Sequence, residues 1–158
     1  MGYLVRMTMD HSHHGSGWSA AVSATLHCLT GCAIGEVLGM VIGTALGWHN
    51  GATVVLSIAL AFLFGYALTA STVLRAGDTL ARAAKVALAV DTLSIITMEV
   101  VDNGVILAIP GAMDAGLGSL LFWGSLALSL AIAFVLTVPV NRWLLARGKG
   151  HTAMHAYH

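Results

Sequence analysis

Long apolar stretches alternate with short polar segments along this 158-residue chain. A helix needs about 20 apolar residues to cross a bilayer. Four stretches reach that length, at about residues 18–48, 52–71, 83–109 and 119–145. Short turns at 49–51 and 110–118 join the first pair and the last pair, and a polar connector at 72–85 contains the start of the third helix. The pattern predicts an all-α, integral membrane four-helix bundle in up-down-up-down order.

The composition agrees with a membrane protein, because 58% of the residues are hydrophobic and only 9% are charged. An ordinary soluble domain has about 25% charged residues. The formal net charge is zero, which gives no indication of nucleic-acid binding. We expect one transmembrane domain, 18–146, between two His-rich tails at 1–17 and 147–158.

Basic residues predict the orientation of the bundle, since Lys and Arg collect in cytoplasmic loops. Six of the chain's seven bases lie in the connector or at and beyond the end of the fourth stretch, namely Arg75, Arg82, Lys85, Arg142, Arg147 and Lys149. The turns at 49–51 and 110–118 contain none. Both tails are therefore expected on the cytoplasmic side.

Glycines recur at every fourth position of the first stretch, at Gly31, Gly35, Gly39, Gly43 and Gly47. Small residues at this spacing let helix backbones approach closely in lipid. The stripe predicts tight helix packing, either within one chain or between copies, and we expect a homo-oligomer.

The first and third stretches carry side chains that are typical cation ligands: His27, Cys28, Cys32, Glu36, Met40, Asp91, Met98, Glu99, Asp102 and Asn103. A charge at the bilayer centre costs at least about 2.5–3.5 kcal/mol. No Lys or Arg lies at comparable depth to offset the carboxylates. The acids therefore either bind a cation or a proton, or are protonated and hydrogen-bonded to Thr92, Ser94, Thr97 and Asn103.

The depths of these residues predict layers, because the first and third helices run in the same direction. At a rise of about 1.5 Å per residue, Cys28 and Asp91 lie at one level. Glu36 and Glu99 lie at a deeper level, where we expect their carboxyl groups to reach one ion or one proton. Met40 falls level with Asp102 and Asn103. The arrangement indicates a ladder of ligands along the bundle axis.

The ligand types favour a transition-metal cation. Thiolate, thioether and imidazole groups select soft ions such as copper, and carboxylates beside them leave zinc as an alternative. The tails add His11, His13, His14, His151, His155 and His158, which we expect to collect metal loosely at the cytoplasmic entrance. The first hypothesis is thus a membrane protein that binds, and transports or hands over, a transition-metal cation.

Two other functions fit the sequence. One is an accessory or assembly subunit of a larger membrane complex, such as a respiratory or copper enzyme, with the glycine stripe against another protein. The other is a membrane thiol oxidoreductase that uses Cys28 and Cys32. Residues four apart on a helix have Cβ atoms about 5–6 Å apart, whereas a disulfide needs about 3.5–4.5 Å. That geometry makes an enzyme the less favoured hypothesis.

Several stretches resemble a bacterial family of small four-span membrane proteins classed as a domain of unknown function. They are "HCLTGCAIGEVLGMVIGTALGW", "FGYALT", "DTLSIITMEVVDN", "IPGAMDAGLG", "LFWGSLALSLAIAF" and "PVNRWLLARGKGH", and they cover most of residues 27–151. The resemblance implies a multi-pass protein of the bacterial inner membrane, and it brings no established activity.

Overall fold

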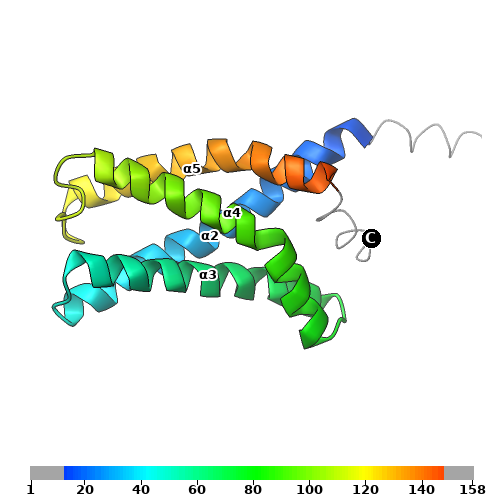
Figure 1. The fold of residues 1–158 in the computed structure, drawn as a ribbon, viewed down its shortest axis with the longest axis horizontal. Helices are drawn as coiled ribbons and strands as arrows, with labels where there is room; N and C mark the ends of the chain where they lie inside the picture. The colour runs from blue at the N-terminus through cyan, green and yellow to red at the C-terminus, as the bar shows by residue number, and fades with distance from the viewer. Residues whose placement is uncertain (1–12, 148–158) are drawn as a thin grey trace, which may run out of the picture.

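The computed structural model describes residues 13–147, and within that range the chain forms helices and no strand. The helices are α2 (His13–Ala45), α3 (Asn50–Arg75), α4 (Leu80–Ala108) and α5 (Leu120–Ala146). The chain reverses direction at each turn, so that the start of α2 and the end of α5 lie at the same end of the bundle (Figure 1). Each helix packs against the next, α5 also packs against α2, and α2 contacts α4 across the middle. The predicted all-α four-helix bundle is confirmed.

Capping residues explain where the helices begin. The side chain of His49 accepts a hydrogen bond from the backbone N–H of Ala52 (3.3 Å) at the start of α3. Thr79 and Ser119 serve α4 and α5 in the same way, since a side-chain oxygen satisfies one of the free N–H groups at a helix start. The connector at 72–85 contains the start of the third helix, because α4 begins at Leu80, and the turn itself occupies only 76–79.

The first helix ends at Ala45, three residues before the predicted boundary. Gly47 has a φ of 67°, a left-handed conformation that glycine adopts without steric cost. The Trp48 N–H bonds the Gly43 carbonyl (2.9 Å) and the Gly47 N–H bonds that of Thr44 (3.2 Å). These bonds form a Schellman motif, which turns the chain toward α3.

Three of the described helices are long and apolar enough to cross a membrane, over Gly17–Ala45, Asn50–Arg75 and Leu120–Ala146. They identify a membrane protein. Helix α4 is 29 residues long, but it carries three of the four acids predicted within apolar stretches and two bases near its start. Its crossing of the bilayer is therefore a proposal.

Four of the five stripe glycines hold α2 directly against α3. They face a matching row of small residues on α3, with Gly31 opposite Gly65, Gly35 opposite Ala61, Gly39 opposite Ser57 and Gly43 opposite Thr53. A Cβ atom added to Gly35 would lie 2.3 Å from the backbone nitrogen of Ala61, so no larger residue fits there. The packing is thus within one chain. Within the described residues, Gly47 meets no such neighbour, and it lies in the turn after α2.

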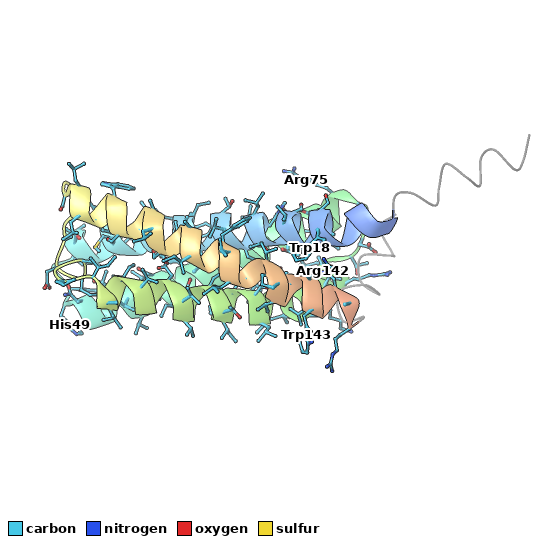
Figure 2. The ribbon with its side chains drawn as sticks, turned by 90° about the horizontal axis from the view of Figure 1, so that it is seen from above. Trp18, His49, Arg75, Arg142 and Trp143 are labelled. Carbon is cyan, nitrogen blue, oxygen red and sulfur yellow. The ribbon has the colours of Figure 1, made fainter. Side chains whose placement is uncertain are left out.

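Trp and Arg side chains gather at the end of the bundle where α2 begins and α5 ends. Arg142 lies over the ring of Trp18, with its guanidinium carbon 3.9 Å from the ring centre. Arg147 lies over Trp143 at 4.7 Å. Figure 2 shows Arg75 at this end as well, and His49 at the opposite end. Aromatic and basic residues of this kind are typical of a membrane interface.

Candidate cation site

The contact between α2 and α4 brings together most of the predicted ligands in successive layers. In the first layer, Cys28 and Asp91 are 2% exposed each. The Cys28 thiol donates to Asp91 Oδ1, with sulfur and oxygen 3.5 Å apart. Cys28 and Asp91, which the sequence places at the same depth, are therefore in direct contact between the two helices.

The second layer joins two sulfur atoms. Cys32 Sγ lies 3.9 Å from Met98 Sδ, and both side chains are 1% exposed. They belong to the central apolar cluster, together with Cys28, Ile95, Ala61 of α3 and Ala133 of α5. The two sulfur layers, Cys28–Asp91 and Cys32–Met98, thus lie at the buried apolar core of the bundle. Both cysteines are free thiols.

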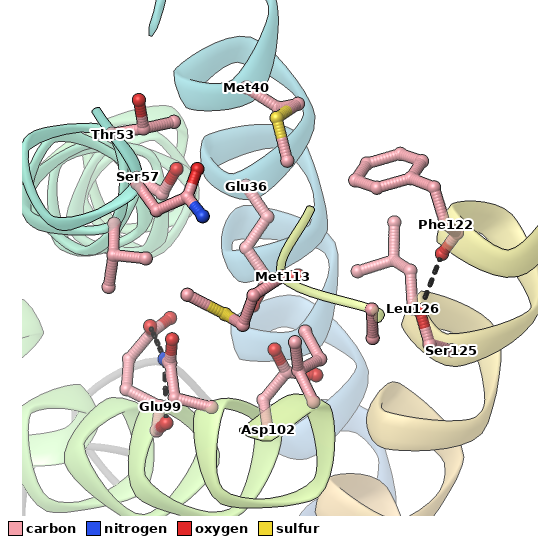
Figure 3. A pocket seen from close by; sticks show the side chains of 15 residues that line it. Glu36, Met40, Thr53, Ser57, Glu99, Asp102, Met113, Phe122, Ser125 and Leu126 are labelled. Atoms are coloured by element: carbon pink, nitrogen blue, oxygen red, sulfur yellow. Dashed lines mark hydrogen bonds between the residues drawn. The ribbon is translucent and has the colours of Figure 1, made fainter. Parts of the chain in front are cut away.

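The third layer is a cavity that we call the acidic chamber. It has about 70 Å³ of space open to a water-sized sphere. Its polar lining residues are Glu36, Asn50, Thr53, Ser57, Glu99, Asp102, Asn103 and Ser125, and Met40 and Met113 also line it. Figure 3 shows Glu36 extending from α2 toward α4, which carries Glu99 and Asp102. The chamber gathers the deeper ligands that the sequence predicts.

The carboxyl groups of the chamber are poorly satisfied. Among the described residues, both carboxyl oxygens of Glu36, both of Asp102 and Oε1 of Glu99 are buried without a hydrogen-bond donor. No ion pair reaches these groups within the described residues. Buried polar atoms in native proteins nearly always have partners, so unpartnered oxygens in such a number indicate a missing ligand, proton or water.

Asn103 is the only one of the predicted hydrogen-bond donors that reaches an acid. Its side-chain amide donates to Glu99 Oε2 (3.2 Å) and to the Glu99 carbonyl (2.9 Å). Thr92 and Thr97 instead donate to carbonyls one turn earlier in their own helix. Ser94 donates to the side-chain oxygen of Asn141 on α5. Hydrogen bonding within the described chain therefore leaves most of the acid oxygens free.

Some predicted ligands lie apart from these layers. His27 is exposed on the outer side of α2, and its ring nitrogen is 3.4 Å from the Ser23 carbonyl. His13 and His14 begin α2, while His11, His151, His155 and His158 lie outside the described residues. Between residues 13 and 147, no three His, Cys, Asp or Glu side chains converge closely enough to form a ready-made metal centre.

A polar bridge crosses three helices toward the end where the termini lie. The Asn141 amide donates to the Thr25 hydroxyl (2.8 Å), and Thr25 in turn donates to its own helix at Ala21 (2.7 Å). With Ser94 on the other side of the amide, Asn141 ties α5 to both α2 and α4. The bridge holds the two ligand-bearing helices in register.

Sequence reasoning missed several contributors to the site, among them Asn50 and Ser125 of the chamber lining. The row Thr53, Ser57, Ala61 and Gly65 has the same four-residue spacing as the glycine stripe, and this spacing would have identified it as the partner face. Met113 reaches the chamber from the loop before α5. No periodic signal marks a loop residue, so only the structure places it there.

The residues that form these layers lie inside the range matched by one family model. The model is DUF4396, a domain of unknown function, and it matches residues 17–150, which is most of the chain. Searches of curated proteins and of solved structures return no match.

Proposed function

We propose a function for this chain, which belongs to the DUF4396 family. It is a four-span membrane protein that binds a soft transition-metal cation between α2 and α4. It then transports the cation or hands it over to another protein. Copper is the favoured ion and zinc the alternative. Because every basic residue near a helix end lies at the end with the termini, we place that end in the cytoplasm of a bacterial inner membrane.

The contact between Cys32 and Met98 carries this proposal. Two sulfur ligands that are each about 2.3 Å from one metal ion lie about 3.8 Å apart at the tetrahedral angle. The observed separation of 3.9 Å matches that value without any movement. A thiolate and a thioether together select a soft ion, as Cu(I) is.

The neighbouring layers supply further ligands along one line. Cys28 Sγ and Asp91 Oδ1 are 3.5 Å apart. This distance is similar to the separation of a sulfur ligand and an oxygen ligand that bind the same metal ion. On the other side of the sulfur pair, Glu99 begins the acidic chamber. Ligands at successive levels would let a cation pass from one to the next. The His-rich tails would collect the metal at the cytoplasmic entrance.

Copper content measured with and without the thiols tests the proposal. We expect the Cys28→Ser/Cys32→Ser variant to lose most of the Cu(I) bound by the purified protein, because serine hydroxyls are poor ligands for a soft ion. Thr30→Ala is the matched control, since Thr30 lies between the two cysteines and bonds only its own helix. The protein should be purified without a metal-affinity column and its helical content measured. Equal copper in the folded double variant and the wild type would remove the thiols from the site.

A further inference from the structure

We infer that the acidic chamber is a second cation site, separate from the sulfur layers, which takes a hard divalent cation such as Mn²⁺ with part of its water shell. The inference rests on the proposed function in one respect, that cations reach the interior of the bundle. The two proposed sites differ in the ion that they bind, in their ligands and in their position in the bundle.

The ligands of the chamber are oxygens. Asp102 is 2% exposed and Glu99 is 5% exposed. Both face the cavity with unpartnered carboxyl oxygens, as does Glu36 from α2. Oxygen ligands of this type bind hard cations such as Mg²⁺, Ca²⁺ and Mn²⁺. The thiols of Cys28 and Cys32 do not line the chamber; its sulfur groups are the neutral thioethers of Met40 and Met113, beside three carboxyl groups.

The size of the chamber fits a hydrated ion. A single water needs about 10–15 Å³ of space measured in this way, so about 70 Å³ holds an ion with several waters. Small divalent cations keep part of their hydration shell in proteins. The carboxyl groups can then act partly through water and need not converge on one point, which agrees with the lack of a ready-made three-residue centre in the described range.

The charge of the chamber also calls for a cation. Three carboxyl groups face it, and within the described residues no ion pair links any of them to a base. Ionised carboxylates in a low-dielectric interior are strongly destabilising unless they are paired or coordinate a metal. A divalent ion would balance most of this charge. The side-chain oxygens of Asn50, Thr53 and Ser57 offer further contacts to its waters.

Mn²⁺ binding to the full-length protein in lipid nanodiscs tests the inference. Free Mn²⁺ is followed by its electron paramagnetic resonance signal during a titration. We expect saturable binding by the wild type and at least a tenfold weaker affinity for Asp102→Asn, which removes a charge but keeps the size of the side chain. Asp78→Asn is the matched control, because it removes one carboxyl group at the turn between α3 and α4, outside the chamber. It should bind Mn²⁺ as the wild type does.

Glu99→Gln provides a second test if Asp102→Asn does not fold, and it should also weaken Mn²⁺ binding. No saturable Mn²⁺ binding by the wild type would overturn the inference, since the chamber would then hold only protons and water. Unchanged affinity in a folded chamber variant would overturn it too. The Cys28→Ser/Cys32→Ser variant separates the two proposals. Normal Mn²⁺ binding by this variant would support the chamber site. If neither the variant nor the wild type binds Cu(I), the proposed soft-metal function fails while the chamber site stands.

Discussion

Helix α2 has two faces with the same four-residue spacing, one for helix packing and one that carries the candidate ligands. One face consists of glycines and lies against the backbone of α3. The other carries Cys28, Cys32 and Glu36 and lies against α4. The glycine face allows no change in position, because helix backbones are in contact there. The ligand face keeps a cavity and free oxygens beside it. A rigid packing face thus fixes the position of the face that carries the ligands, and a binding site needs such preorganisation.

The largest effect is expected where the packing face is disturbed. A Cβ atom at Gly35 would lie 2.3 Å from Ala61 N and 2.6 Å from Ala61 Cα, and neither backbone atom can move aside. We expect Gly35→Ala to lower the free energy of unfolding by at least about 2 kcal/mol and to reduce the yield of folded protein. Unfolding in mixed micelles would measure this effect.

Gly104→Ala is the matched control, because Gly104 lies within α4 with no atom close enough to meet an added Cβ. Alanine is the better helix former by about 1 kcal/mol, so this variant should be equally or more stable. If both variants behaved alike, close contact between α2 and α3 would not determine the fold.

The polar bridge should give the next largest effect, since it connects the ligand-bearing helices to α5. Asn141→Ala removes hydrogen bonds to both Thr25 and Ser94. Polar contacts between membrane helices contribute modestly, so we expect a loss of about 1–2 kcal/mol in unfolding free energy. Ser129→Ala serves as the control, because its hydroxyl is fully buried but bonds its own helix at Leu126. Equal losses in the two variants would argue against a bridging role for Asn141.

The long apolar stretches predict the helices, and the helical rise predicts the level shared by Cys28 and Asp91, but it did not identify the contact between Cys32 and Met98. Cys28 meets Asp91 because depth along parallel helices depends only on residue number and rise. Direction around the helix was harder to predict. A four-residue step turns the helix about 40° beyond a full turn, so Thr44, four steps after Cys28, is exposed while Cys28 is buried.

Features that depend on neighbouring chain segments could not be read from the pattern. Gly47 continues the glycine spacing, yet its place at the end of α2 gives it a turn conformation. Met113 enters the chamber because of the path of a loop, which has no periodicity. The absence of a base near the acids was visible from the sequence, but which acid oxygens are left without partners depends on side-chain geometry.

Met98→Leu should separate binding from stability on the ligand face. Leucine has nearly the same volume, so the unfolding free energy should change by less than about 1.5 kcal/mol. The thioether next to Cys32 is lost, however, and we expect Cu(I) affinity to fall by roughly tenfold, which corresponds to about 1.4 kcal/mol. Competition with a Cu(I) chelator would measure the affinity. Unchanged affinity would show that Cys32 binds without Met98, whereas a large loss of stability would show that the sulfur contact is mainly structural.

His27 should give the smallest effect, although its sequence position beside Cys28 makes it an obvious candidate ligand. Adjacent residues on a helix point about 100° apart, and His27 is exposed while Cys28 is buried against Asp91. We therefore expect His27→Ala to leave both Cu(I) affinity in detergent and unfolding free energy unchanged within about 0.5 kcal/mol, as is usual for a surface position. The chelator competition used for Met98→Leu provides the comparison. A tenfold loss of affinity in His27→Ala would contradict this expectation and would show that the imidazole takes part in metal binding.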